Sequence, residues 1–311
     1  MKNPWKKINL PQSDLNIRLV DSDHPLDLYW GLNASESYLF IIHADSLPPA
    51  KSLPELEGLG ALVTNKDGRE LLILELKDNA NWEIFHALCL DLTAATKELK
   101  NSKSGGPVIL RRLERWQDFL KNKKSVLLSR EAMKGLIGEI LFLKKVANEL
   151  NWQVAIESWK GPEGSPQDFS VNDSAIEVKC QSGSSRPRVK INSIDQLDPQ
   201  SPKGFLAVYT LTNSDENSSF TINSITDSIR QEIITESPST RERFEDLLFG
   251  AGYVHNEKYD DYSFKETDFK TYAVKDGFPR LVASEIPSGI LTASYEIHLD
   301  SCADFLEPVN F

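Results

Sequence analysis

The 311-residue sequence has only three cysteines, Cys89, Cys180 and Cys302, and they are isolated, with no Cys-x-x-Cys pair. This pattern favours a reducing compartment and argues against a structural zinc site. No run of about 18 apolar residues could span a membrane, and the basic N-terminus has no apolar stretch behind it. We therefore expect a cytoplasmic protein that does not engage a membrane.

Three common catalytic signatures are also missing. The five histidines are scattered, without the HxH or HxxxH spacing that a zinc site needs. No serine stands in a GxSxG turn, and no GxxxxGK[ST] loop is present to bind ATP. The sequence thus argues against a histidine-based zinc enzyme, a serine hydrolase of the elbow type and an ATPase, so any ATPase would have to be a partner.

Positive charge is in the minority, because 35 Lys and Arg stand against 46 Asp and Glu, a net charge of −11. The distribution is uneven. Residues 97–145 hold 13 basic and 5 acidic residues, and residues 179–203 hold 5 and 2, whereas residues 242–268 hold 3 and 8. Phosphates respond to charge within roughly 8–10 Å. DNA therefore stays possible as a partner, although a solvated helix face explains the first basic zone equally well.

The pattern along the chain predicts two domains separated near residue 100. Residues 1–100 are expected to form a mainly β module, with strands at YLFIIHA and on either side of the Asp67-Gly68 turn, followed by a helix in NWEIFHALCLDLTAATKEL. The polar, glycine-rich stretch KNSKSGG is the expected linker. Residues 101–311 form the second predicted domain, with its core at about 129–212.

The second domain is predicted to be α/β, of the α+β kind, with an α-β-β-β-α-β core. A helix at 108–122 precedes a second helix capped by Ser129; WQVAIES alternates like a strand and a hairpin follows. Ser193 and Gln196 resemble a capping box for a short helix, and KGFLAVYTLT resembles a buried strand. Two helices are expected next, in SITDSIRQEII and after Ser237-Pro238. The tail from residue 253 is expected to be β-rich.

The hairpin QDFSVNDSAIEVKCQS carries an unusual set of charges. With Asn172-Asp173 as its turn, Asp168 lies opposite Glu177, and strand alternation adds Lys179 and Gln181 to the same side. Opposed carboxylates repel each other, and a divalent cation between them reverses that effect. A lysine nearby could hold a phosphate or an attacking water.

The alternative is a solvated salt-bridge cluster, and the chain contains two triplets of that kind for comparison. They are Glu75-Leu76-Lys77 and Asp268-Phe269-Lys270. In the first, the pairing around Asp67-Gly68 puts Gly60 opposite Glu75, so no second carboxylate faces it. We interpret both triplets as surface charges and the 168–181 hairpin as the site.

Glu139 lies within an apolar stripe of the second predicted helix. A buried carboxylate is normally paired or bound to metal, because burial without a partner costs several kcal/mol. Gly135 and Gly138 weaken the helix but would let its backbone approach a sheet or phosphate closely. An arginine partner, or a side chain that reaches the helix edge, is the alternative for Glu139. The stripe consists of Ala132, Leu136, Glu139, Leu143, Val146 and Leu150.

These residues resemble the PD-(D/E)XK nuclease superfamily, which has the restriction-endonuclease-like fold. Glu139, Asp168 and the Glu177-Val178-Lys179 triplet stand in that family's order, with Pro166 one residue early, and Gln181 matches a polar residue that many members carry. GLIGEILFL, INSIDQL and GFPRL…IPSGI…SYEIHL resemble a bacterial, restriction-associated branch of the superfamily. The resemblance implies DNA cleavage in restriction or phage defence, beside a DNA methyltransferase and a separate ATPase.

The residues and the resemblance together predict an endodeoxyribonuclease that uses Mg²⁺, with Mn²⁺ as a substitute. Asp168, Glu177 and the Val178 carbonyl would hold the metal, and Lys179 would activate the water and stabilise the transition state. Glu139 would bind a second metal or its water shell. DNA-binding side chains are expected in Gln181 and in a flexible loop with Arg186, Arg188 and Lys190. The rival interpretations are a non-catalytic DNA-binding or scaffold subunit and an RNA nuclease; double-strand cleavage would suit a homodimer.

Overall fold

The computed structural model describes residues 2–12, 14–66, 68–97, 99, 101–122, 127–183, 187–199, 201–216 and 218–311. The chain divides into two compact units, Met1–Val126 and Leu127–Phe311. The division lies later than the expected boundary near residue 100, because the helix after KNSKSGG packs on the first unit. Asp91 explains this attachment, since its carboxylate accepts from Trp116 Nε1 at 3.0 Å and pairs with Arg112 at 3.2 Å.

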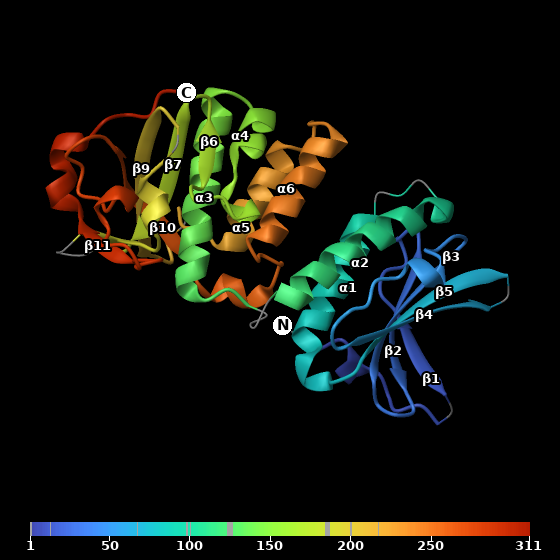
Figure 1. Ribbon diagram of the computed structural model, residues 1–311. Coiled ribbons are helices and arrows are strands. Elements are labelled where there is room, and N and C mark those ends of the chain that lie inside the picture. Colours follow the sequence, from blue (N-terminus) through green and yellow to red (C-terminus); the bar gives the residue numbers. More distant parts are fainter. Residues whose placement is uncertain are drawn as a thin grey trace. The chain divides into compact units, whose positions relative to one another are not determined.

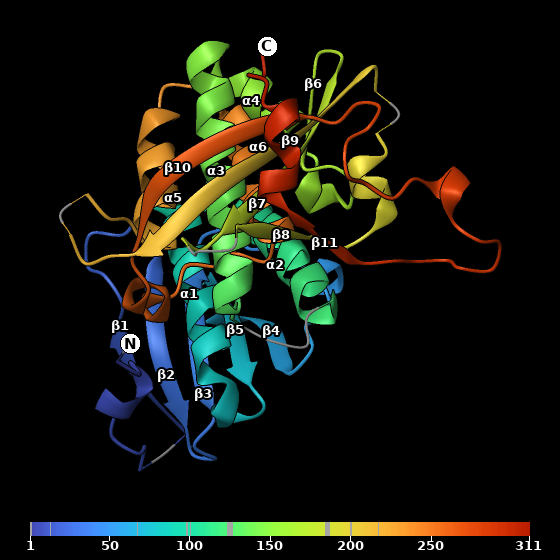
Figure 2. The same ribbon diagram turned by 90° about the vertical axis from the view of Figure 1, so that its left-hand side faces the viewer.

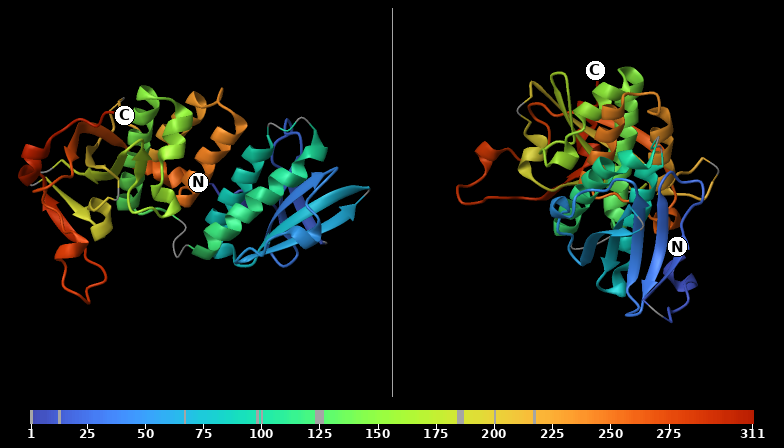
Figure 3. Two further views of the ribbon diagram at one scale, coloured as in Figure 1. Left: turned by 45° about the horizontal axis from the view of Figure 1, so that its top comes forward. Right: turned by 90° about the vertical axis from the view of Figure 1, so that its right-hand side faces the viewer.

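The first unit is a five-stranded antiparallel sheet with two helices along it (Figure 1; Figure 3, left). The strand order is β1-β2-β3-β5-β4. Apolar residues alternate along β5, so Leu72, Leu74 and Leu76 are buried. Trp5 is buried and stacks on Tyr38 and Phe85 with ring centroids 5.0 and 5.2 Å apart. The elements are β1 Leu15–Leu19, β2 Asp27–Asn33, β3 Tyr38–Ala44, β4 Leu59–Lys66, β5 Arg69–Leu76, α1 Trp82–Thr96 and α2 Gly105–Asn122, with 3-10 turns η1 Trp5–Lys7, η2 Ala50–Ser52, η3 Asn79–Asn81 and η4 Ser102–Ser104.

The expected β module is thus present, with the β4–β5 pairing that puts Gly60 opposite Glu75. Asp67, at the predicted turn, lies outside the described residues, while Gly68 follows with φ +80°. The predicted helix after β5 is α1.

The second unit contains a four-stranded sheet in the order β10-β9-β7-β6 and a two-stranded ribbon, β8–β11. β7 and β9 are parallel, and the other neighbouring strands are antiparallel. Figure 2 shows β9 and β10 side by side, and the segment between η8 and β11 extending away from them. The elements are α3 Arg130–Glu149, α4 Trp152–Ser158, β6 Phe169–Val171, β7 Ser174–Gln181, β8 Arg188–Ile191, β9 Lys203–Asn213, α5 Ile222–Glu232, α6 Pro238–Gly250, β10 Phe264–Ala273 and β11 Tyr295–His298, with 3-10 turns η5 Gly161–Glu163, η6 Ile194–Leu197, η7 Glu257–Asp261, η8 Ala283–Glu285 and η9 Leu299–Phe305.

Two apolar layers enclose this sheet. On one face, α3 packs on β7 and β9, and Ile137, Ile140, Val178 and Tyr209 belong to one buried cluster. The other face carries Leu206 and Val208 of β9 against residues from β8, β11 and η9. The register pairs Glu177 with Leu206 and Lys179 with Val208, so the charged residues of the hairpin belong to this second face.

The mixed α+β class is confirmed, but two predicted details are wrong. WQVAIES is the helix α4, not a strand; Asn151 caps it by accepting from Val154 N at 2.8 Å, and Ala155 and Ile156 are buried one turn from Trp152 and Trp159. The order after Ser129 is therefore α3, α4, β6, β7, β8, η6, β9. The second wrong detail is the tail from residue 253, which was expected to be β-rich. It holds two strands, β10 and β11, and otherwise consists of 3-10 turns and irregular segments.

The helix caps follow the sequence closely. Ser129 accepts from Ala132 N at 3.1 Å, and Ser237 accepts from Thr240 N at 3.2 Å with Pro238 at the first helical position. All three cysteines are free. None of the helices in the described ranges combines the length and apolar character that crossing a membrane requires.

Candidate functional site

The β6–β7 hairpin has the predicted register. Phe169 pairs with Ile176 and Val171 with Ser174, and the turn begins at Asn172, whose φ is +52°. Asp168 directly precedes β6 in the chain and lies just outside this ladder. Its backbone carbonyl turns away from β7 and accepts from Lys160 N at 2.7 Å and Gly161 N at 3.0 Å. Its carboxylate, rather than its backbone, makes a hydrogen bond with β7, because Oδ2 accepts from Val178 N at 2.8 Å.

This hydrogen bond also defines the direction of the Val178 carbonyl. The N–H and C=O groups of one residue in a strand point toward the same edge. Because the Val178 N–H points to the Asp168 carboxylate, the Val178 carbonyl points to the same edge of β7. A side-chain oxygen of Asp168 and the main-chain oxygen of Val178 therefore face the same edge of β7; that both bind one metal ion stays a prediction.

Glu139 reaches this edge from α3. Its Oε2 accepts from the indole nitrogen of Trp159 at 2.7 Å, and Trp159 is fully buried. A Cβ placed on Gly161 would lie 2.8 Å from Asp168 Oδ1 and 3.2 Å from Glu139 Oε2. The two carboxylate oxygens are thus no more than about 6 Å apart, the sum of these distances, and glycine leaves the space beside them open. Glu139 itself is half-buried rather than buried, and its partner is Trp159 in place of an arginine.

Glu177 and Lys179 form an ion pair beside these carboxylates. Glu177 is 1% exposed, and Lys179 Nζ lies 2.5 Å from Glu177 Oε1. Apart from this ion pair, neither Glu177 oxygen has a hydrogen bond to any residue that the structure describes. We call Glu139, Asp168, Glu177 and Lys179 the carboxylate site.

The electrostatics of the carboxylate site show a shortage of positive charge. Burial, reinforced by the charge of Asp168, raises the pKa of Glu139 to about 8, against the opposing effects of Trp159 and Lys179. Burial raises the pKa of Asp168 to about 6, although Val178 N and Lys179 act in the opposite direction. Burial and the Asp168 charge likewise raise the pKa of Glu177 well above its usual range. With three acids and one lysine, full ionisation would leave a local charge of 1 − 3 = −2.

The donor atoms fit a hard divalent cation in their chemistry. All are oxygens from carboxylates and a carbonyl, the ligands that Mg²⁺ prefers, and among the described residues Glu177 has no polar partner other than Lys179. Within the part of the chain that the structure describes, no three or more His, Cys, Asp and Glu side chains already stand together as a formed metal centre. Convergence of Asp168 and Glu177 on one ion therefore stays a prediction.

The predicted substrate-binding residues are dispersed. Gln181 is two residues beyond Lys179 on the same strand face, donates from Nε2 to Thr210 Oγ1 at 3.0 Å and borders a cavity of about 120 Å³. Arg188 and Lys190 do not lie in a flexible loop: they are exposed residues of β8. Arg188 pairs with Glu296 at 3.2 Å, and Lys190 lies opposite Glu296 in the β8–β11 ladder. Arg186 lies outside the described residues.

Sequence reasoning missed three residues of this region. Trp159 and Gly161 come together in SWKGPEG, where the only available signal was a lone tryptophan followed by a turn. Gln196 was predicted to cap η6 with Ser193, but Ser193 makes no side-chain cap there. Instead, Gln196 Oε1 accepts from Asn192 N at 2.7 Å and from Lys179 Nζ at 3.4 Å.

The two comparison triplets remain surface features. Glu75 faces Gly60 across β4–β5 and accepts from Asn33 Nδ2 at 3.0 Å. Lys270 pairs with Asp268 at 2.8 Å, and about half of each side chain is exposed. The carboxylate site differs from both because it combines the buried Glu177 with the half-buried Glu139 and Asp168, all three with raised pKa values.

Comparison with known proteins gives one match. The family model described as "Putative PD-(D/E)XK family member, (DUF4420)" matches residues 1–300, and so covers the first unit and most of the second. No curated protein and no solved structure matches the chain.

Proposed function

The chain belongs to this family related to the PD-(D/E)XK nucleases, and we propose that it is a Mg²⁺-dependent endodeoxyribonuclease that acts in restriction or phage defence. The observation that carries the proposal is the carboxylate site: the buried Glu177 and the half-buried Glu139 and Asp168, whose pKa values are all raised, lie beside one lysine, and those of Glu139 and Asp168 reach about 8 and about 6. Strongly shifted acids in one place are typical of functional sites. The family resemblance supplies DNA as the substrate, and with it a DNA methyltransferase and an ATPase as proposed partners.

The residues have distinct proposed roles. Asp168, Glu177 and the Val178 carbonyl would hold the ion, and Glu139 would bind a second ion or its water shell. When bound, Mg²⁺ supplies the positive charge that polarises the phosphate and stabilises the leaving oxygen. Lys179 orients the attacking water and stabilises the negative charge that grows on the phosphate, since it is the one basic residue of the carboxylate site.

The DNA backbone would meet the exposed basic side chains of the β8–β11 ribbon. Arg188 and Lys190 are on its exposed face, and both lie close to Glu296 in the ladder. Because the net charge is −11, binding should depend on such confined basic surface and weaken steeply with salt. Gln181 is the proposed contact nearer the reacting phosphate.

The decisive test is cleavage of supercoiled plasmid with and without Mg²⁺, followed by two substitutions. Lys179→Ala should lower the rate of cleavage by about 10²–10³-fold, because it removes a group that acts in the transition state, while Mg²⁺ and DNA still bind. Asp168→Asn keeps an acceptor for Val178 N but should lose metal binding as well as cleavage. Binding is measured in Ca²⁺.

Lys77→Ala is the matched control. It removes the lysine of the Glu75-Leu76-Lys77 triplet, which has the same spacing on an exposed strand end, and should cleave like the parent. Cleavage by Lys179→Ala at the parent rate would refute the role given to Lys179. A parent protein that binds DNA but never cuts it, even with a methyltransferase and an ATPase present, would establish the scaffold alternative instead.

A further inference from the structure

The 3-10 turn η6 contacts the carboxylate site through one side chain. Gln196 Oε1 accepts from both Asn192 N, at 2.7 Å, and Lys179 Nζ, at 3.4 Å. Both groups are donors, and neither can accept a hydrogen bond in these protonation states, so the atom between them must be the amide oxygen rather than the amide nitrogen. The orientation of the Gln196 amide is therefore fixed by its main-chain partner, independently of Lys179.

The turn itself is held firmly. Leu197 is 1% exposed and Ile194 8% exposed. Gln167 Nε2 donates to the carbonyl of Asp195, and Arg280 Nη1 donates to the carbonyl of Leu197 at 2.5 Å. Two hydrogen bonds therefore anchor the turn that carries Gln196. One of them comes from Gln167, the residue that precedes Asp168 in the chain.

Lys179 needs such a fixed partner. A lysine side chain has four rotatable carbons and a compact ammonium that can turn in any direction. Its described partners are Glu177 Oε1 at 2.5 Å and Gln196 Oε1 at 3.4 Å. Glu177 is a proposed metal ligand, so Gln196 is the partner that does not change its own charge or coordination during a reaction.

We propose that Gln196 is a positioning residue, which holds the Lys179 ammonium in the direction that catalysis requires. The expected effect on turnover rests on the proposed function, whereas the contact between Gln196 and Lys179 does not. Gln196 adds no charge to the site and needs no contact with DNA, so its loss should lower kcat and leave KM unchanged.

The test uses three variants of the full chain. Gln196→Ala removes both hydrogen bonds and should lower kcat about 10- to 100-fold, the range for a lost hydrogen bond to a charged group. Gln196→Glu retains an acceptor oxygen and should recover most of that loss. Gln167→Ala is the matched control, because it removes another glutamine bond to η6 without touching Lys179, and it should stay within about twofold of the parent.

A second readout does not depend on cleavage. The rate at which an amine-reactive reagent modifies Lys179, followed by peptide mass spectrometry, should rise in Gln196→Ala and remain at the parent value in Gln196→Glu and Gln167→Ala. If Gln196→Ala matches the parent in Lys179 modification, the positioning role is refuted. An equal loss of kcat in Gln167→Ala would show that η6 as a whole, rather than Gln196, is responsible. If the parent does not cut DNA, the proposed function fails while the labelling result still decides the inference.

Discussion

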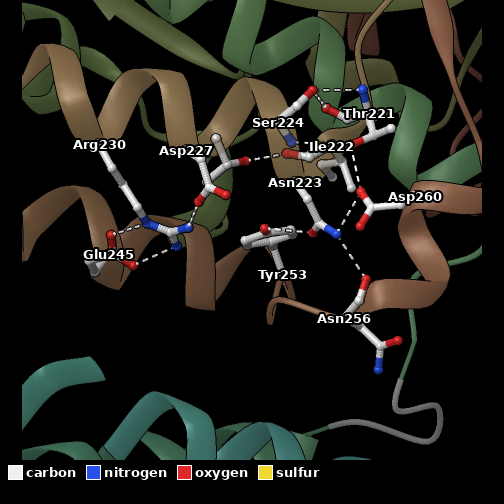
Figure 4. A network of polar contacts seen from close by, with 11 residues as sticks. Thr221, Ile222, Asn223, Ser224, Asp227, Arg230, Glu245, Tyr253, Asn256 and Asp260 are labelled. Atoms are coloured by element: carbon white, nitrogen blue, oxygen red, sulfur yellow. Dashed lines mark hydrogen bonds and ion pairs between the residues drawn. The ribbon is translucent and has the colours of Figure 1, made fainter. Parts of the chain in front are cut away.

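The polar side chains around α5 and α6 satisfy one another, whereas those of the carboxylate site do not. Figure 4 shows the first group, the α5 network, which consists of Thr221, Asn223, Ser224, Asp227, Arg230, Glu245, Tyr253, Asn256 and Asp260. Arg230 donates to both Glu245 oxygens at 2.7 and 3.0 Å and to Asp227 at 2.7 Å. Asn223 donates to Asn256 O and Asp260, each at 3.0 Å, and accepts from Tyr253 at 2.9 Å.

Pairing and burial act in opposite directions in the two groups. In the α5 network, burial works against the charge of Arg230, but hydrogen bonds and the charge of Glu245 outweigh it, so the pKa of Arg230 is raised. At the carboxylate site, burial outweighs the pairing with Lys179, so the pKa values of all three acids are raised. The α5 network therefore favours the charged form of Arg230, whereas the carboxylate site disfavours the charged forms of its three acids.

We infer from this difference that the α5 network has a structural role and that the carboxylate site is the functional one. Buried polar groups in native proteins normally find partners within the protein. Several acids that share too little positive charge are costly to ionise in a low-dielectric environment, and an added cation can remove this cost. The α5 network needs nothing from outside, and it joins α5 to η7 and α6. We propose that a divalent cation completes the carboxylate site.

The largest expected effect is the pH dependence of stability without metal. The pKa of Glu139 in the folded chain is about 8, above its ordinary 4.5, so the stability that its protonated form contributes is complete below pH 4.5 and is lost as the pH rises through 8. The protonated form of Asp168 contributes stability in the same way, and this contribution is lost as the pH rises from 3.8 through about 6. In chelator, the free energy of unfolding by urea should fall between pH 5 and pH 8 by on the order of 3 kcal/mol. Glu139→Gln should flatten the curve and be more stable than the parent at pH 8; a flat parent curve would contradict the comparison.

The second expected effect is a loss of stability, because the substitution removes a positive charge from the α5 network. Arg230→Met leaves Glu245 and Asp227 without their partner and should destabilise the protein by about 2 kcal/mol, less than for a fully buried pair since 30% of the Arg230 side chain is exposed. Urea unfolding measures it. Arg188→Met is the control, since Arg188 and Glu296 are both more than half exposed and should change stability by less than about 0.5 kcal/mol. Equal losses in both variants would mean that the network is only a surface feature.

The smallest effect concerns how α3 brings Glu139 to the site. A Cβ on Gly138 would overlap the sulfur of Cys180 on β7, whereas a Cβ on Gly135 would meet nothing within 4 Å. Gly138→Ala should therefore destabilise the protein by about 1 kcal/mol or more, through overpacking, and Gly135→Ala should stabilise it by up to about 1 kcal/mol, through helix propensity. Thermal unfolding of the two variants checks the signs. Stabilisation by Gly138→Ala would show that α3 does not rest on β7 at this point.

Local patterns predicted the hairpin and the helix caps because their geometry is set within a few residues. The turn at Asn172 fixes which residue faces Ile176, and Ser129 and Ser237 cap the helices that they precede. The inward position of Glu139, which is half-buried, also follows from a local periodicity. Only one of the two predicted glycines, Gly138, proves to lie against the sheet.

The remaining features depend on contacts between distant segments. The seven residues of WQVAIES fit either a strand or one buried helical face, and the helix is selected by the Asn151 cap together with the position of Trp159 against Glu139 and Phe169. The attachment of α2 to the first unit depends on Asp91. Gln196 has the spacing of a capping box, yet its oxygen is used by Asn192 and Lys179. Local sequence rules do not predict the contact of Trp159 with Glu139, of Asp91 with Trp116 or of Gln196 with Lys179.

The most direct measurement of the central claim is the thermal unfolding midpoint as a function of Mg²⁺ concentration. A cation that completes the carboxylate site binds the folded chain and raises the midpoint. The rise should be clear at pH 8, smaller at pH 6, where protons compete for the carboxylates, and absent in Asp168→Asn. A parent protein with no Mg²⁺-dependent shift at pH 8, or an equal shift in Asp168→Asn, would contradict the account.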